Sequence, residues 1–68
     1  MVRADLLRKE MRIKDVSVDA LSEALGMNKS TFYRKLNGDT IPFDTDDLKV
    51  MRKVLKLSFS KMNDIFFK

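Results

Sequence analysis

The chain has 68 residues, of which 44% are hydrophobic and 35% charged, and it carries a formal net charge of +4. A chain of this length holds one modest core, and this composition is typical of a folded protein rather than a disordered or membrane-spanning one. It contains no cysteine and no histidine, which excludes a disulfide framework, a zinc site built on Cys or His, and nucleophile–imidazole catalysis. With only 2 glycines it also lacks the means for a phosphate-cradling loop. We therefore expect no enzyme activity, no cofactor and no metal.

The chain also lacks the marks of export or membrane insertion. No apolar stretch approaches the roughly 20 residues needed to span a bilayer. The opening residues, Met1 to Asp5, have neither the apolar run nor the small-residue cleavage site of a signal peptide. We expect a single domain, residues 1–68, located in the cytoplasm.

The spacing of apolar residues favours helices throughout, because they recur three and four positions apart while strand-like alternation never persists. The first predicted helix, 3–13, takes its apolar stripe from Val2 and Leu6, with Leu7 and Met11 as further candidates. The second, 18–25, contributes Leu21, Ala24 and Leu25 to the core. The third, 29–37, contributes Phe32 and Leu36. The fourth, 45–56, contributes Leu48, Met51, Val54 and Leu55. The fifth, 59–66, contributes Met62, Ile65 and Phe66. The fold class is therefore all-α, with five helices.

The last four of these helices share one start signal. Each has a capping residue preceded by an apolar residue that can pack on another apolar residue four positions after the cap. The sets are Val16, Ser17 and Leu21; Met27, Asn28 and Phe32; Phe43, Asp44 and Leu48; and Leu57, Ser58 and Met62.

The stretch from Val16 to Gly38 contains the most informative pattern. Gly26 can adopt a positive φ at little cost, so it ends one helix and turns the chain while Met27 points inward and Asn28 starts the next helix. Two helices joined in this way have the geometry of a helix-turn-helix. No acidic residue occurs from Ala24 through Gly38, whereas Lys29, Arg34 and Lys35 fall inside that window. This local positive charge favours a negatively charged partner.

The segment SVDALSEALGMNKSTFYRKLNG, residues 17–38, resembles the lambda-repressor-like, Cro-type helix-turn-helix family. The likeness covers nearly the whole chain, since residues 43–57 look like the family's fourth helix and 63–67 like the end of its fifth. The resemblance implies a compact five-helix lambda-repressor-like DNA-binding domain, with the helix-turn-helix at helices 2 and 3. It also implies that the protein binds operator DNA and regulates transcription, as a homodimer at least on DNA.

Three positions differ from the family's usual residues. Val18 stands where the family often has a glutamine that touches a phosphate or supports a base contact, so that contact does not carry over. Lys35 stands where the family prefers an aliphatic residue, which leaves Leu36 as the inward residue and frees Lys35 toward solvent or DNA. Ser22 replaces the usual alanine and is small enough to let the two helices approach.

The 3.6-residue period of the third helix points Phe32 and Leu36 inward and leaves its other face outward. A helix docked in a major groove about 12 Å wide reaches base edges with its N-terminal and mid-helix outward residues. The candidates for base edges are Lys29, Ser30, Tyr33 and Arg34. The candidates for phosphates are Asn28, Thr31, Lys35 and Asn37, with Arg12 and Lys14 as additional backbone contacts.

Several of these residues also have a purely structural interpretation. Asn28 is explained by capping alone, and Lys29, Arg34 and Lys35 can form an ordinary solvated face. Tyr33 can lean over the Leu36 side of the core. For five further residues we prefer a structural role. Asp44, Asp46 and Asp47 are expected to stabilise a helix start. Phe59 and Phe67 are expected in the core, and the alternative for these two phenylalanines is a dimer interface.

The leading functional hypothesis is a sequence-specific double-stranded DNA-binding regulator, a repressor of phage or prokaryotic type. The alternative is a protein-interaction module, antirepressor or antitoxin-like, that uses the same helical scaffold and a surface near residues 59–67. Nonspecific nucleic-acid compaction is a third possibility.

Overall fold

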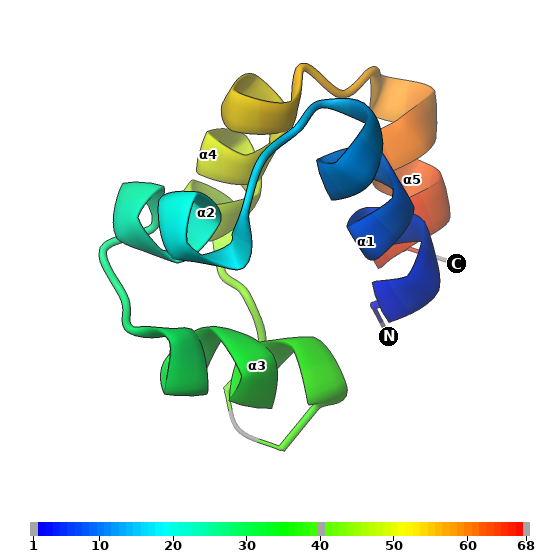
Figure 1. Cartoon of the computed structure of the whole chain (residues 1–68). Helices are drawn as coiled ribbons and strands as arrows, with labels where there is room; N and C mark the ends of the chain where they lie inside the picture. The colour runs from blue at the N-terminus through cyan, green and yellow to red at the C-terminus, as the bar shows by residue number, and fades with distance from the viewer. Residues whose placement is uncertain (1, 40, 68) are drawn as a thin grey trace.

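The computed structural model describes residues 2–39 and 41–67, and over these residues the chain forms five α-helices and no strand (Figure 1). Their bounds are α1 Ala4–Ile13, α2 Val18–Ala24, α3 Lys29–Asn37, α4 Thr45–Leu55 and α5 Phe59–Phe66. The all-α prediction is confirmed, and each predicted helix is present with its ends within one residue of the predicted ones. In the part of the chain described, no helix has the length and apolar character needed to cross a membrane.

The predicted caps start α2 to α5. The side chains of Ser17, Asn28 and Ser58 each accept a hydrogen bond from the backbone N–H three residues later, at 3.0, 2.8 and 3.1 Å. Asp44 does the same with the N–H of Asp47 at 2.8 Å, and the Asp47 carboxylate accepts the Asp44 N–H at 3.1 Å, which completes a capping box. The structural interpretation of these two aspartates is therefore confirmed.

The start of α1 follows a different rule, since no side chain caps it. The Arg3 backbone N–H instead donates to the Ile65 carbonyl at 2.7 Å, which ties the beginning of the chain to α5. The Arg3 guanidinium donates to both carboxylate oxygens of Asp5, at 3.1 and 2.9 Å, and these hydrogen bonds lower the pKa of Asp5 below its ordinary value. Because Arg3 is the N-cap, the helix begins at Ala4 instead of the predicted residue 3.

Left-handed backbone ends the helices where the sequence needs a turn. Gly26 has φ +73° and Gly38 has φ +80°, a conformation that only glycine adopts freely. Leu25 caps α2, which therefore ends at Ala24 and not at the predicted residue 25. Lys56 also has a positive φ, 53°, so α4 ends at Leu55 and not at residue 56.

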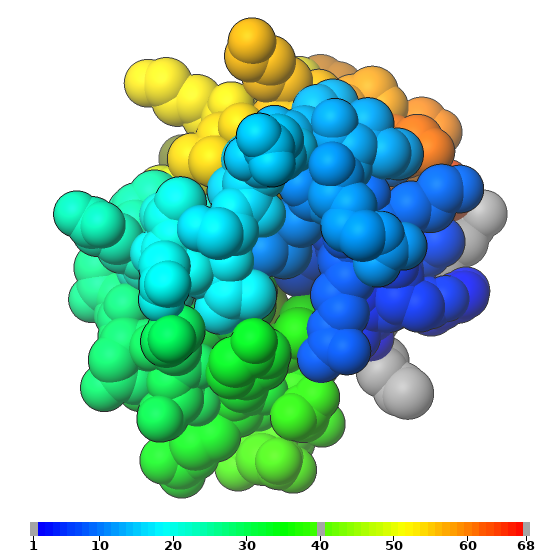
Figure 2. Space-filling view, in the orientation of Figure 1, coloured from blue at the N-terminus to red at the C-terminus, as the bar shows by residue number. Residues whose placement is uncertain are grey.

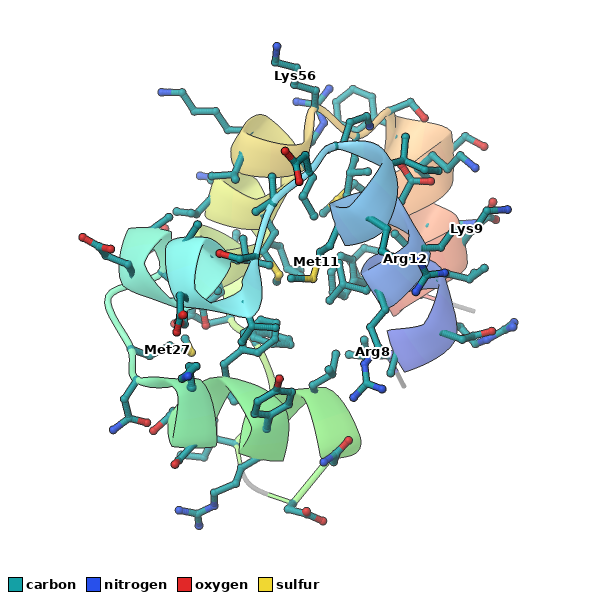
Figure 3. All side chains as sticks on the ribbon, in the orientation of Figure 1. Arg8, Lys9, Met11, Arg12, Met27 and Lys56 are labelled. Carbon is teal, nitrogen blue, oxygen red and sulfur yellow. The ribbon has the colours of Figure 1, made fainter. Side chains whose placement is uncertain are left out.

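The core draws on all five helices. Its fully buried side chains include one or more from each of them: Leu7, Leu21, Phe32, Met51, Leu55 and Ile65. Around α1, the two main core candidates, Val2 and Leu6, are only half-buried. The two further candidates, Leu7 and Met11, are the buried ones. Figure 3 shows Met11 pointing into the middle of the molecule. α5 packs on α1 and sets which of its faces is buried.

Two of the core predictions are wrong. Ala24 is exposed at the end of α2, and the buried small residue of that helix is Ser22, which lets α2 pack on α3 as expected. Phe59 and Phe67 do not enter the core, since they are 76% and 64% exposed. Phe59 is the first residue of α5 and Phe67 follows its last, and Met62, Ile65 and Phe66 already fill the buried face of the helix.

A buried carboxylate joins three elements. Glu10 on α1 is buried and lies 3.3 Å from the Lys14 ammonium and 3.7 Å from that of Lys61 on α5. The Lys14 ammonium also donates to the carbonyl of Leu55, the last residue of α4, at 2.8 Å. These bonds fix α1 between α4 and α5.

The arrangement leaves α3 at one end of the molecule. α1 packs on α5 and α2 packs on α4, whereas α3 contacts α2 below them in the view of Figure 1. Figure 2 shows the side chains of α3 and of the segment after it covering this end. The face of α3 turned away from the other helices is therefore available to a partner.

Candidate nucleic-acid interface

The inward face of α3 fastens the helix to the core. Phe32 is fully buried and Leu36 nearly so. The Phe32 ring lies 5.8 Å from that of Phe43, whose ring lies 6.3 Å from that of Phe66, so three aromatic rings connect α3 to the segment before α4 and to α5. The predicted inward role of Phe32 and Leu36 is confirmed, and α3 presents its other side as a rigid surface.

The outward face carries all four base-edge candidates. Lys29, Ser30 and Arg34 are exposed, as is Asn37 at the helix end. Tyr33 is 38% exposed, and its ring meets the edge of Phe32 at 5.9 Å between centroids. Tyr33 therefore contacts Phe32 and keeps part of its ring at the surface.

The connection between α2 and α3 is short and is held by backbone hydrogen bonds. The Gly26 N–H donates to Glu23 O and the Met27 N–H donates to Ser22 O, both at 3.0 Å. Met27 is half-buried against the core, and Figure 3 shows it between α2 and α3. The Asn28 side chain then caps α3. This turn fixes the angle at which α3 leaves α2.

The fold brings the acidic residue Asp19 next to residues 24–38, the stretch of sequence without acidic residues. Asp19 on α2 lies 3.2 Å from the Lys29 ammonium, and both side chains are mostly exposed. The charge pattern of residues 24–38 alone gave no sign of this pair, because Asp19 lies outside the window. An exposed ion pair contributes about 0–1 kcal/mol, so Lys29 is easily recruited by a stronger anion.

Two of the phosphate candidates are less available than the sequence suggests. Lys35 is half-buried and its ammonium donates to the Ile41 carbonyl at 3.2 Å, so it ties α3 to the following segment. This hydrogen bond is an exposed one, and the phosphate contact of Lys35 stays a prediction. Thr31 is also half-buried. Asn28 and Asn37 remain exposed beside the outward face.

A second group of cations lies next to the start of α2. Arg8 and Arg12 on α1 line an open cleft together with Ser17 and Ala20. Figure 3 shows the Arg8 side chain directed toward the end of the molecule formed by α3. Sequence reasoning named Arg12 and Lys14 here and missed Arg8, although the four-residue spacing of Arg8 and Arg12 places them on one helix face. Lys14 instead belongs to the Glu10 cluster.

Residues 2–39 and 41–67 contain no group of three or more acidic side chains that could bind a metal ion. The exposed residues of α3 itself carry cationic, hydroxyl and amide groups. Such groups donate hydrogen bonds to phosphates and base edges.

Comparison with models of known protein families, with curated proteins and with solved structures finds no match to this chain.

Proposed function

We propose that this chain is a helix-turn-helix protein of lambda-repressor-like fold that binds operator DNA and regulates transcription, as a repressor of phage or prokaryotic type. One observation carries the proposal. α3 buries Phe32 and Leu36 and exposes Lys29, Ser30 and Arg34 at an end of the molecule that no other helix covers. A cationic helix face held in this way suits a major groove.

Sequence discrimination comes from the exposed side chains of α3. The Arg34 guanidinium is a planar fork that matches the O6 and N7 acceptors of guanine, and Lys29 favours the same atoms. Ser30 adapts to either a donor or an acceptor. Tyr33, anchored by its contact with Phe32, meets a thymine methyl or a phosphate.

Phosphate contacts set the position of α3 on the duplex. The Asn28 carbonyl oxygen is occupied by its cap, so its amide nitrogen is the group that donates to a phosphate. Asn37 lies at the other end of the helix. Arg8 and Arg12 beside the start of α2 extend the cationic surface, and they act on the backbone of the flanking groove.

Two copies bind one operator in this proposal. One nine-residue helix reaches few base pairs, and specific complexes usually combine two half-sites about 34–36 Å apart. The operator is then a palindrome.

Selection of bound duplexes from a random library tests the proposal. We expect enrichment of a palindromic sequence with half-sites one helical turn apart. The proposal is contradicted if repeated rounds enrich no sequence over the input library, which is also the result that nonspecific compaction predicts.

The exposed phenylalanines favour a second candidate, the protein-interaction module. Phe59 and Phe67 present large apolar rings to the surface, as a protein-binding site does. Charge reversal at Lys29 and Arg34, compared with Phe67→Ser, separates the candidates. Loss of duplex binding in the first variant alone supports DNA binding, whereas a folded chain with no affinity for any duplex supports the interaction module.

A further inference from the structure

A second stretch of the sequence without acidic residues extends from Leu48 to Asn63. It holds more cations than residues 24–38, namely Lys49, Arg52, Lys53, Lys56 and Lys61. The proposed DNA contacts use none of these residues, so DNA recognition by α3 does not account for their charge.

Four of these cations form one stripe along α4, which we call the basic face. Lys49, Arg52 and Lys53 follow the i, i+3, i+4 spacing of a single helix face, and Lys56 continues it at the C-cap. All four side chains are exposed, and the stripe is roughly 10 Å long at 1.5 Å per residue. No carboxylate among the described residues forms an ion pair with any of the four. The basic face therefore attracts anionic groups of another molecule.

The helix dipole explains only part of this stripe. Cations are favoured in the last turn of a helix, and Arg52 and Lys53 lie in the last turn of α4. Lys49 lies in the first half of the helix, where the dipole does not favour a cation. The dipole also does not require residues 57–63, which follow the helix, to lack acidic residues.

The basic face lies away from the proposed DNA interface. The C-terminal half of α4 and its connection to α5 lie at the end of the molecule opposite α3 (Figure 1). Figure 3 shows Lys56 projecting from that end. A partner bound to the basic face leaves the outward face of α3 uncovered.

An exposed aromatic ring adjoins the basic face. The Arg52 guanidinium lies over the Phe59 ring, 4.0 Å from its centroid, and this phenylalanine is 76% exposed. A guanidinium over an aromatic ring can still bind a carboxylate through the donors at its edge. The ring adds an apolar contact.

This combination distinguishes between the anionic partners. The phosphate backbone of a second duplex offers charge but no apolar group to the Phe59 ring. An anionic lipid surface binds through buried apolar area as well as charge, and needs more of that area than one ring supplies. A protein segment that carries both carboxylates and an apolar side chain uses the cations and the ring together.

We propose that the basic face and the Phe59 ring dock an acidic segment of another protein, in which carboxylates flank an apolar side chain. The carboxylates pair with Arg52 and the lysines beside it, and the apolar side chain packs on the exposed part of the Phe59 ring. This docking does not require DNA. Its consequence, that the chain carries the partner to an operator while α3 stays in the major groove, rests on the proposed function.

Fluorescence anisotropy with labelled peptides and the full chain tests this proposal. The probe is a short peptide with one leucine flanked on both sides by glutamates. Two matched peptides replace all the glutamates with glutamine, or the leucine with serine. We expect the chain to bind the probe roughly tenfold more tightly than the glutamine peptide and about threefold more tightly than the serine peptide.

Variants locate the bound peptide. Lys53→Glu and Phe59→Ser should each weaken probe binding by roughly fivefold or more, the first by repulsion and the second by loss of apolar contact. Lys9→Glu makes the same charge change on α1, and Ile41→Ser removes an apolar side chain that is 75% exposed. Each of these two controls should change binding by less than about twofold. Circular dichroism checks that every variant stays folded.

The proposal is overturned if the glutamine or the serine peptide binds as tightly as the probe, or if Lys53→Glu weakens binding no more than Lys9→Glu. It is also overturned if scrambled duplex or phosphatidylserine vesicles bind the chain in a way that depends more on Lys53 and Phe59 than probe binding does.

Failure of the proposed function gives a different result. In that case no duplex binds, and the peptide titrations of the free chain still decide whether the basic face docks an acidic segment. If a selected duplex does bind, the saturated complex should bind the probe within about twofold of the free chain. Loss of probe binding in the complex would place the peptide on α3 and overturn the proposal.

Discussion

Arg34 combines exposure with the most specific chemistry of any residue on α3. Its guanidinium presents a rigid fork of donors, whereas the ammonium of a lysine is a point charge with no preferred plane. It lies on the outward face, with Phe32 and Leu36 holding the helix from behind. A change at this position should therefore affect discrimination between sequences more than overall affinity.

We predict that Arg34→Ala reduces the discrimination between selected and scrambled duplex by about 1–3 kcal/mol. Arg34→Lys should keep most of the affinity for scrambled duplex, because it keeps the charge, and lose much of the discrimination. Fluorescence anisotropy titrations at one fixed salt concentration measure both. Equal discrimination in all three chains would remove Arg34 from the base contacts.

Asp19 acts against binding in the proposed complex, because its carboxylate holds Lys29 and repels phosphate. Asp19→Asn should therefore raise duplex affinity by roughly two- to fivefold. Asp46→Asn is the matched control, since it makes the same charge change at an exposed position on α4 and should have a smaller effect. An unchanged or lower affinity for Asp19→Asn would show that Lys29 does not contact DNA.

The residue-scale features that sequence reasoning missed are tertiary contacts. The Lys29–Asp19 pair crosses from α3 to α2, and the Lys35–Ile41 hydrogen bond crosses a turn. Helical periodicity assigns each side chain to a face but does not say which group on a neighbouring segment it meets. The exposure of the base-edge candidates was predictable because it depends only on which face of α3 each side chain occupies.

Helices are the scale at which the sequence is most informative. A cap, an inward apolar residue before it and a glycine after the helix are local features, and local geometry decides where these helices begin and end. Asn28 and Gly38 bound α3 in this way. The ends differ by one residue at three helices, and at one of them, α4, the cause is a backbone conformation unusual for its residue, since Lys56 adopts positive φ without being glycine.

Asn28 has two roles in this account, and substitutions separate them. Asn28→Ala removes the cap and should lower the free energy of unfolding by about 0.5–2 kcal/mol. Asn28→Asp keeps the cap and so keeps stability, but it places a negative charge near the phosphate and should weaken duplex binding. Urea unfolding measures the first effect and anisotropy the second. Unaltered binding in Asn28→Asp would leave Asn28 with the capping role alone.

The whole molecule depends on contacts between elements distant in the sequence. Glu10 and Lys14 on α1 join the end of α4 to α5. The helical pattern predicted a core from all five helices but not the order in which they pack, so it placed Val2 and Leu6 before Leu7 and Met11. The same gap explains Phe59 and Phe67, because only the packed structure shows that the other apolar residues of α5 fill its buried face.

Lys14 has a structural role in this arrangement, through Glu10 and the Leu55 carbonyl. Lys14→Met keeps its aliphatic stem but leaves the buried Glu10 with only the more distant Lys61, so it should lower the free energy of unfolding by about 1–3 kcal/mol. Lys61→Met should cost less than about 1 kcal/mol, because its ammonium lies 3.7 Å away and is more exposed. Urea unfolding compares them. A destabilisation by Lys61→Met as large as that by Lys14→Met would contradict this division of roles.

The most direct measurement of the central claim compares two variants that lose the same charge from different helices. Lys29→Ala with Arg34→Ala removes two cations from α3, and Lys49→Ala with Lys53→Ala removes two exposed cations from α4. Affinity for selected and scrambled duplex is measured for each at the same salt concentration. If the outward face of α3 lies in the major groove, the α3 variant loses its discrimination and the α4 variant keeps it. Retained discrimination in the α3 variant, or an equal loss in both, would contradict the account.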